Sequence, residues 1–424
     1  MSAQQVIDNK KNWIKERLRY IDKTYWIIFG LLMIVSVIAL FTASSSLAFK
    51  NGTVLGPVMS HIKFLFLGAI CAFGIQLVPS KWVRYGGYAV CAISFILLLL
   101  TFTPLGVSRN DAARWIRLFG VEFQPSELAK ISLIITASGL LSRIKSPQDT
   151  KKYFFITLGV TALICAPIFP SNFSTTVMLG FIIFLMFFLA RVPAKYWLTT
   201  IGVVFVLLIS GYFYVEKAYI EPQKSIDSNS KMKRVVTWCG RIDDLITEIK
   251  TPDEQFKLTD ENYQRTLSKV AVARGGTSPV GVLPGNSTLR SRLPQAFADY
   301  IFAIIVEETG IVGAIGLIFL YLAFLFRACY TSSRYSDYQA MLMVMGLALM
   351  ITFQALVSML VVVGIGPVTG QPLPLISRGG TSTLVTCVYF GIIMCVAREQ
   401  NELRAKQTAA TAESREDAPE IILD

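Results

Sequence analysis

The segment QAFADYIFAIIVEETGIVGA, residues 295–314, begins as a polar loop and continues as an apolar run of the kind that crosses a bilayer. Asp299 lies at the junction, and two further carboxylates, Glu307 and Glu308, lie inside the apolar run. An ionisable side chain within a membrane segment is costly, so it normally faces the bundle interior or a water-filled cavity. The segment therefore predicts a helical membrane protein in which Asp299 lies where a wet cavity meets the membrane. Glu307 and Glu308 should face the interior.

Apolar runs of similar length recur along the whole chain. The protein has 424 residues, of which 53% are hydrophobic and 16% are charged, whereas soluble domains carry roughly 25% charged residues. A membrane-spanning helix needs ~20 mainly apolar residues. We therefore predict an all-α polytopic membrane protein with ten transmembrane helices. The predicted spans are 25–43, 62–78, 86–103, 126–142, 153–169, 173–190, 196–214, 300–326, 340–364 and 380–397.

The net charge of +12 is a topology signal rather than a sign of nucleic-acid binding. Twenty of the forty Lys and Arg residues fall in the tails and short loops on one side of the predicted bundle, against six in the short loops on the other. Because basic short loops remain cytoplasmic, both termini are predicted to be cytoplasmic and the loop 215–299 external. We expect a multi-pass protein of the cytoplasmic (inner) membrane, in contact with membrane lipids and not with nucleic acid.

The spans divide the chain into five parts. These are a cytoplasmic amphipathic segment (1–24), helices one to seven (25–214), a large external loop (215–299), helices eight to ten (300–397) and a disordered cytoplasmic tail (398–424). A loop as long as 215–299 in a tight bundle is usually functional. Within it we predict a short surface helix over 263–276, with Tyr263, Leu267, Val270 and Arg274 on one face.

The fourth predicted span opens with FQPSELAKISLII, which places Glu127 and Lys130 on one helix face. Gln124 ends the preceding loop, and Ser126 is a candidate helix cap. One interpretation is a capping carboxylate beside a lysine that snorkels to the interface. The other is a charged pair that lines an outward-opening polar cavity. We favour the second, because other polar groups converge on the same end of the bundle.

A loop rich in arginine is also predicted to lie at that end. Arg109, Arg114 and Arg117 accompany Trp115 in a loop at the predicted outer interface. Arginine suits anionic phosphate groups, although interfacial anchoring explains any single one equally well.

The segment GIGPVTGQPLPLISRGGTSTLV (364–385) is too rich in Gly and Pro for a continuous helix. Irregular backbone at membrane depth is tolerated only where it is buried or lines a cavity. Ser377 and Gly379-Gly380 then open the last span with backbone N–H groups placed to accept an anion, although close helix packing would also explain the two glycines.

Histidine and cysteine limit the possible chemistry. His61 is the only histidine, which excludes histidine-based catalysis and most transition-metal sites, and we expect it to be an ordinary interface residue. Of the seven cysteines, only Cys239 falls in the predicted external part, so no intramolecular disulfide is expected there.

Three ordered motifs in the chain resemble the SEDS family (shape, elongation, division and sporulation), the ten-span peptidoglycan polymerases that include FtsW and RodA. The motifs are AARWIRLFGVEFQPSELAKISLI, ARGGTSPVGVLPGNSTLRSRLPQAFADYIFAIIVEETGIVGA and LPLISRGGTSTL. The stretches TASSSLAF and GNS are more similar to the division branch, which is FtsW-like, than to the RodA-like branch.

The resemblance implies roles for individual residues. Asp299 matches the essential loop aspartate of the family, Glu127 and Lys130 its required helix-four pair, and Arg114 its loop arginine. The chain departs from the family pattern beside the aspartate. Phe297-Ala298 stand where His-Thr is usual, Tyr300 where Phe is usual, and Arg378 where Tyr or Met is common.

The resemblance also implies an activity. A glycosyltransferase of this family polymerises lipid II, an undecaprenyl-pyrophosphoryl disaccharide peptide, on the outer face of the membrane. We expect Asp299 to act as the base, Arg114 and Lys130 to hold the pyrophosphate, with room for a divalent cation, Mg²⁺ or Mn²⁺, and no organic cofactor. The expected partners are a class B penicillin-binding protein and other division proteins. A lipid II flippase and a non-catalytic scaffold for a transpeptidase remain as alternatives.

Overall fold

A computed structural model describes most of the chain. It covers residues 15–43, 55–109, 112–118, 120–215, 217, 239–240, 263–277, 297–367 and 369–416. Most of the predicted loop 215–299 and the first fourteen residues of the predicted N-terminal segment therefore lie outside the described residues. In the described part of that segment, residues 15–19 are helical.

A helix lies at each of the ten predicted spans. Their bounds are α2 (Lys23–Ala43), α4 (Leu55–Leu77), α5 (Ser80–Leu100), α6 (Pro125–Leu141), α7 (Pro147–Ile168), α8 (Phe173–Leu189), α9 (Ala194–Val215), α12 (Ile301–Ser332), α13 (Tyr338–Val362) and α14 (Thr381–Glu416). Within the described ranges, eight are long and apolar enough to cross a membrane. The other two, α6 and α8, have 17 residues each. The polytopic helical fold is confirmed, while the count of ten spans stays a prediction.

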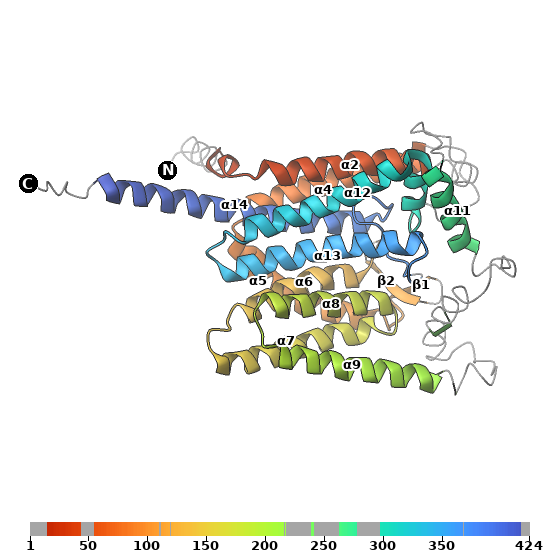
Figure 1. Ribbon diagram of the computed structural model, residues 1–424, viewed down its shortest axis with the longest axis horizontal. Helices are drawn as coiled ribbons and strands as arrows, with labels where there is room; N and C mark the ends of the chain where they lie inside the picture. The colour runs from red at the N-terminus through yellow and green to blue at the C-terminus, as the bar shows by residue number, and fades with distance from the viewer. Residues whose placement is uncertain are drawn as a thin grey trace, which may run out of the picture.

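The helices run side by side, with α6, α13 and α14 in the interior and α9 at one edge (Figure 1). Small residues allow close packing between α14 and α4, since a Cβ added to Gly391 would lie 2.8 Å from the Cα of Ala72. Helices in membranes associate through such small-residue contacts, because lipid and leucine are equally apolar. The apolar stretch of α9 is exposed along its length, as expected for a helix that faces lipid.

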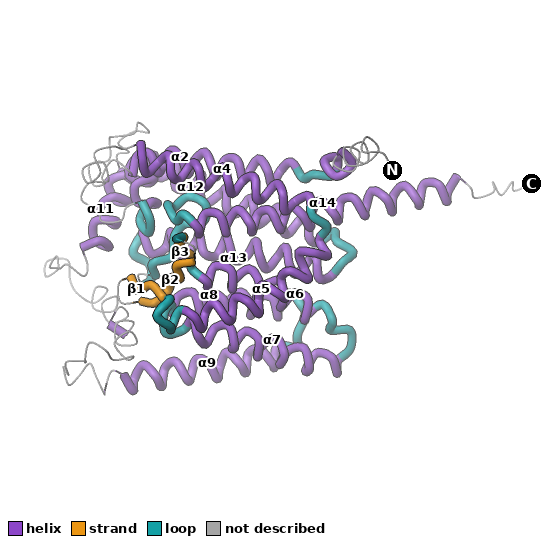
Figure 2. The backbone as a smooth tube through the Cα atoms, turned by 180° about the vertical axis from the view of Figure 1, so that it is seen from behind, coloured by secondary structure: helices purple, strands orange, loops and turns teal. Residues whose placement is uncertain are grey.

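The two ends of the bundle differ. The helix α11 (Tyr263–Thr277) and a small sheet lie at one end, while residues 15–19 and the end of α14 lie at the other (Figures 1 and 2). We refer to these as the outer and the inner end, following the charge distribution. The arrangement agrees with a loop on one side of the membrane and both tails on the other, and the side that each end faces stays a prediction.

The sheet was not predicted from the sequence. Strands β1 (Gly106–Arg109), β2 (Ala112–Leu118) and β3 (Val121–Phe123) form an antiparallel meander in the order β1-β2-β3. Ile116 is fully buried while Arg117 is exposed, which is the alternation of a strand with one covered face. Gly120, with φ +80°, makes the turn between β2 and β3. The alternation was missed in the sequence because the three arginines in this segment were interpreted as a polar loop.

The prediction for the C-terminal end of the chain needs correction. The tail 398–424 was predicted to be disordered, but α14 continues to Glu416, and the residues beyond it lie outside the described part. The tail is rich in Ala, Glu, Lys and Arg, which are strong helix formers, and Glu402 and Lys406 form an i,i+4 ion pair at 2.7 Å.

A helix is present at the predicted residues 263–276, and its buried residues are not the four that were predicted to share one face. Arg265, Ser268 and Ala271 are buried, whereas Val270 is 46% exposed. The helix uses small and hydrogen-bonding residues to lie against α12 and the end of α13, rather than an apolar stripe.

Candidate active site

Asp299 lies immediately before α12 at the outer end. The N-cap of α12 is Tyr300, whose side chain makes no capping hydrogen bond. The Asp299 side chain is half-buried, and a Cβ added to Gly370 would lie 3.8 Å from its Oδ2 atom. Asp299 therefore lies one residue before the N-cap position of α12, close to the irregular segment that contains Gly370.

The irregular segment between α13 and α14 supports the backbone beside Asp299. Ser377 Oγ donates to the carbonyl of Ala298 at 2.5 Å and accepts from Leu373 N at 2.9 Å. Arg378 N donates to the carbonyl of Phe297 at 3.0 Å. The predicted residue Ser377 thus acts on the chain directly before Asp299, and residues 371–378 form a fixed turn beneath that carboxylate. We call residues 371–378 the support turn.

Two of the departures from the family pattern, Phe297 and Arg378, touch each other. The Arg378 guanidinium lies 5.6 Å from the centre of the Phe297 ring, within the range of a cation–π contact. Together with the backbone bond between the same two residues, this contact gives Arg378 a positioning role that the sequence did not reveal.

Glu127 and Lys130 form the predicted pair, with Lys130 Nζ 2.8 Å from Glu127 Oε1. Lys130 is 1% exposed, and its ammonium also donates to Gln354 Oε1 at 3.0 Å, so it does not snorkel to the interface. Buried ion pairs need such additional hydrogen bonds to offset desolvation.

The start of α6 corrects one prediction. Gln124, not Ser126, occupies the N-cap position, and Pro125 follows at the first helical position. Gln124 Nε2 donates to Ser126 Oγ at 2.9 Å, so the two predicted residues pair with each other beside the buried Glu127. Proline is favoured at the first helical position, because the N–H that it lacks would have no partner within the helix.

Gln354 of α13 is a site residue that the sequence analysis missed. Its Oε1 accepts from Lys130, and its Nε2 donates to the carbonyl of Pro372 at 3.0 Å. One amide side chain thus connects the charged pair on α6 with the support turn beside Asp299. A glutamine within the apolar run 340–364 was the available signal, because polar residues in a span usually face the bundle interior.

Strand β2, which contains Arg114, and the support turn both contact the region where α7 ends and α8 begins. Arg114 Nε donates to the carbonyl of Ser171 at 2.6 Å. Gln371 Nε2 donates to Thr175 Oγ1 at 2.7 Å in the first turn of α8. Trp115 follows Arg114 in β2, is half-buried, and pairs with Val107 of β1. Arg114 and Trp115 therefore lie at the outer end as predicted.

Gly379 and Gly380 directly precede α14. Gly380 has φ +53°, and a Cβ added there would lie 3.9 Å from the Phe64 ring. The Thr381 hydroxyl, at the first position of α14, donates to the carbonyl of Glu122 at 3.5 Å. The glycines thus let the chain turn into α14 close to β3, and the proposed anion contact of their N–H groups stays a prediction.

Glu307 and Glu308 face the interior, as predicted, with 0% and 4% exposure. Glu307 Oε1 lies 4.0 Å from Arg274 Nη1 of α11. A Cβ added to Gly275 would lie 2.0 Å from the carbonyl oxygen of Val306, so α11 rests on the backbone of α12. The first turns of α12 are buried on all sides until Gly310, whose φ of +69° and ψ of −167° interrupt the helix.

Comparisons with known proteins agree with this architecture. A family model described as "Cell cycle protein" (FtsW/RodA/SpoVE) matches residues 22–402. A protein of Saccharophagus degradans named "Probable peptidoglycan glycosyltransferase FtsW" is 30% identical over 379 residues, which cover 87% of this chain and 91% of the relative. The "Peptidoglycan glycosyltransferase MrdB" of Escherichia coli is 26% identical and covers 92% of this chain and 96% of its own length.

Two solved structures share the fold. One is described as "Structural coordination of polymerization and crosslinking by a peptidoglycan synthase complex". It has a TM-score of 0.69 and 22% identity, and covers 90% of this chain and 98% of its own. The other is the rod shape determining protein RodA of Thermus thermophilus, with a TM-score of 0.60, 20% identity, and coverage of 90% and 97%.

Proposed function

The chain belongs to the FtsW/RodA/SpoVE family of cell cycle proteins, and we propose that it polymerises lipid II into glycan strands on the outer face of the cytoplasmic membrane. It is a multi-pass membrane protein and, like the relatives it matches, a peptidoglycan glycosyltransferase. One observation carries the proposed mechanism. The backbone directly before Asp299 is fixed by two hydrogen bonds from the support turn, which hold this half-buried carboxylate at the outer end of the bundle.

In the proposed reaction, Asp299 is the general base. It takes the proton of the GlcNAc 4-hydroxyl while that oxygen attacks the MurNAc anomeric carbon of the donor. The new glycosidic bond forms as the bond to undecaprenyl pyrophosphate breaks, with inversion of configuration. Pyrophosphate leaves without protonation, so a second carboxylic acid, as glycosidases use, is not required.

Cationic groups at the outer end would stabilise the departing pyrophosphate. A lysine ammonium has three N–H donors, and within the described residues Lys130 gives two of them to Glu127 and Gln354. The third donor suits a phosphate oxygen, with Glu127 orienting the ammonium. The hydrogen bond from Arg114 Nε to the Ser171 carbonyl would fix the orientation of the guanidinium, so that its other N–H groups can bind the pyrophosphate.

A divalent cation remains part of the proposal. The described residues contain no group of three or more His, Cys, Asp or Glu side chains that could hold a metal ion. Mg²⁺ commonly keeps several waters and is held by substrate phosphates with one or two carboxylates. Asp299 or Glu127 would supply such a carboxylate, and the cation would neutralise pyrophosphate charge.

The proposed partner is a class B penicillin-binding protein, because glycan strands must be crosslinked after polymerisation. A structure that shares this fold is described as a complex of polymerisation and crosslinking, which supports the proposal. Other division proteins would join the complex if the chain acts at the septum. Relatives named FtsW favour a role in division, while the similarity to MrdB leaves elongation as the alternative.

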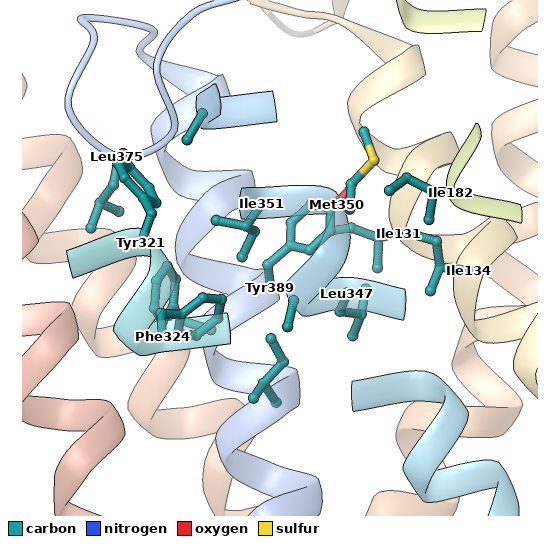
Figure 3. Packing of buried hydrophobic residues seen from close by; sticks show 14 of the residues in the cluster. Ile131, Ile134, Ile182, Tyr321, Phe324, Leu347, Met350, Ile351, Leu375 and Tyr389 are labelled. Atoms are coloured by element: carbon teal, nitrogen blue, oxygen red, sulfur yellow. The ribbon is translucent and has the colours of Figure 1, made fainter. Parts of the chain in front are cut away.

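A flippase role is less well supported. Moving a lipid head group across the bilayer needs a polar path through its whole depth. Apolar side chains instead fill the space between α6, α13 and α14, as seen for Ile131, Ile134, Leu347, Met350 and Ile351 (Figure 3). The polar groups of the candidate site lie at the outer end of this packing.

Purified protein and lipid II provide the test, with glycan strands separated on a gel. We expect strands from the wild-type chain, and more of them when a class B penicillin-binding protein is added. An Asp299→Asn preparation, purified in parallel, is the negative control for contaminating polymerases. Equal strand formation by both preparations would refute the proposed function and would favour the scaffold alternative.

A further inference from the structure

The support turn contains a residue in an unfavourable backbone conformation. Leu375 has φ +68° and is one of two non-glycine residues with positive φ in the described ranges. A side chain with a Cβ resists this left-handed region, so neighbouring groups must hold it there. The Leu375 side chain is 2% exposed, which shows that the turn is packed rather than open.

Two fully buried polar residues of other helices hold this turn. Ser36 Oγ of α2 lies 2.8 Å from the carbonyl oxygen of Leu375 and 3.2 Å from that of Ile376. His61 Nε2 of α4 lies 2.8 Å from the same Ser36 Oγ. Ser36 is 0% exposed and His61 1% exposed, so neither bond competes with bulk water.

Hydrogen-bond chemistry fixes the direction of this chain. A carbonyl oxygen can only accept, so the single Ser36 hydroxyl proton must point to the Leu375 and Ile376 carbonyls. The Ser36 oxygen must then accept from His61, which places the imidazole proton on Nε2. The result is a directed series, His61 Nε2–H to Ser36 O–H to the Leu375 carbonyl.

We propose that Ser36 and His61 are positioning residues for the glycosyl transfer, acting on Asp299 through the support turn. This inference rests on the proposed role of Asp299. The path is short, because Ser377 and Arg378 follow Leu375 in the turn and bond to the carbonyls of Ala298 and Phe297. A misplacement of about 1 Å in a catalytic group costs about a hundred-fold in rate, so a distant buried serine can affect the reaction.

The test uses Ser36→Ala, His61→Leu and the double variant in the full-length protein. We expect each single variant to lower kcat by about 10- to 100-fold with little change in the KM for lipid II. Because the two bonds act in series, the double variant should be no worse than Ser36→Ala. His61→Gln, whose amide N–H can replace Nε2–H, should recover most of the rate.

A matched control is Ser94→Ala in α5. Ser94 is also 0% exposed, and its hydroxyl has no hydrogen-bond partner within the described residues. It should keep wild-type kcat. If Ser94→Ala falls as much as Ser36→Ala, the effect is general to buried serines and the proposal is refuted.

A second readout is independent of activity. The amides of Leu373, Ile376, Ser377 and Arg378 are all hydrogen-bonded in or beside the support turn. Their hydrogen exchange should rise at least tenfold in Ser36→Ala and His61→Leu, and not in Ser94→Ala. Wild-type exchange and wild-type kcat would overturn the proposal, as would a parallel loss of melting temperature and lipid II binding. If Asp299→Asn proved active, the function proposed above would fail, while unchanged exchange would separately refute the Ser36–His61 support.

Discussion

The outer and inner ends of the bundle both contain charged side chains, but the two ends use them differently. At the inner end the Glu399 carboxylate accepts from Ser80 N and Ser80 Oγ, each at 2.6 Å, and so caps the first turn of α5. Asp337 caps α13 through Gln339 N at 2.9 Å and also pairs with Arg84 at 2.5 Å. These carboxylates satisfy helix N-termini, which is a stabilising role.

At the outer end, Asp299 and Glu127 lie beside helix starts but outside the N-cap positions, which Tyr300 and Gln124 occupy. Asp299 follows backbone that the support turn fixes, and Glu127 pairs with Lys130 in a network that reaches the same turn. Sequence alone cannot separate these cases, because Asp337, Glu127 and Asp299 all lie near the start of a helix, and the contact of Glu399 with α5 is made only on folding. We therefore expect that substitutions of the outer-end carboxylates lower the reaction rate, whereas substitutions of the inner-end carboxylates lower stability.

Apart from Asp299 itself, the largest effect in this comparison is expected from the charged pair. Glu127→Ala and Lys130→Ala should each reduce polymerisation at least about 100-fold, because each leaves its partner buried without a counter-charge. The double variant should be little worse than either single one, since both remove the same interaction. Gel assays on membrane-inserted, purified protein measure this, and additive losses would show that the residues act separately.

A smaller loss, of about tenfold in kcat, is expected for Gln354→Leu. The change removes the link between Lys130 and Pro372 and leaves a backbone carbonyl without its donor. Gln76→Leu is the matched control, because Gln76 is a fully buried glutamine bonded to Trp26 at 2.9 Å near the inner end. It should lower stability and keep kcat. Equal kcat for the two variants would contradict the claim that polar groups at the outer end act on the rate and those at the inner end on stability.

Glu307→Gln should reduce the yield of folded protein several-fold while the rate per folded molecule stays close to wild type. Glu307 is fully buried against α11, where Arg274 Nη1 lies 4.0 Å from its Oε1, so we assign it to interior packing rather than to the reaction. Size-exclusion yield and specific activity separate the two effects. A normal yield with a much lower specific activity would place Glu307 among the reactive groups instead.

The smallest effect is expected for Asp337→Ala at the inner end. Loss of a helix cap costs about 1 kcal/mol, which should lower the melting temperature by about 1–3 °C and leave polymerisation unchanged. Thermal unfolding in detergent, followed beside the gel assay, measures both quantities. A large fall in rate would show that the inner end also takes part in the reaction.

The sequence predicted what apolar length and charge determine. Runs of ~20 apolar residues located each helix, and Asp299, Glu127 and Lys130 were chosen because ionisable groups in a membrane are costly. It could not show that Ser377 and Arg378 fix the backbone before Asp299, since these bonds depend on how the irregular segment folds. It also missed Gln354 and Ser36, whose roles come from the folding of the support turn, and it treated His61 as an ordinary interface residue.

The exchange of one carboxylate for its amide at each end tests the central claim most directly. Melting temperature and initial polymerisation rate should be measured on the same preparations of Asp299→Asn and Glu399→Gln. For Asp299→Asn we predict an unchanged melting temperature, retained lipid II binding and no glycan strands. For Glu399→Gln we predict a lower melting temperature and a wild-type rate per folded molecule, because the amide cannot accept both bonds from Ser80. Long strands made by Asp299→Asn at close to the wild-type rate would contradict the account.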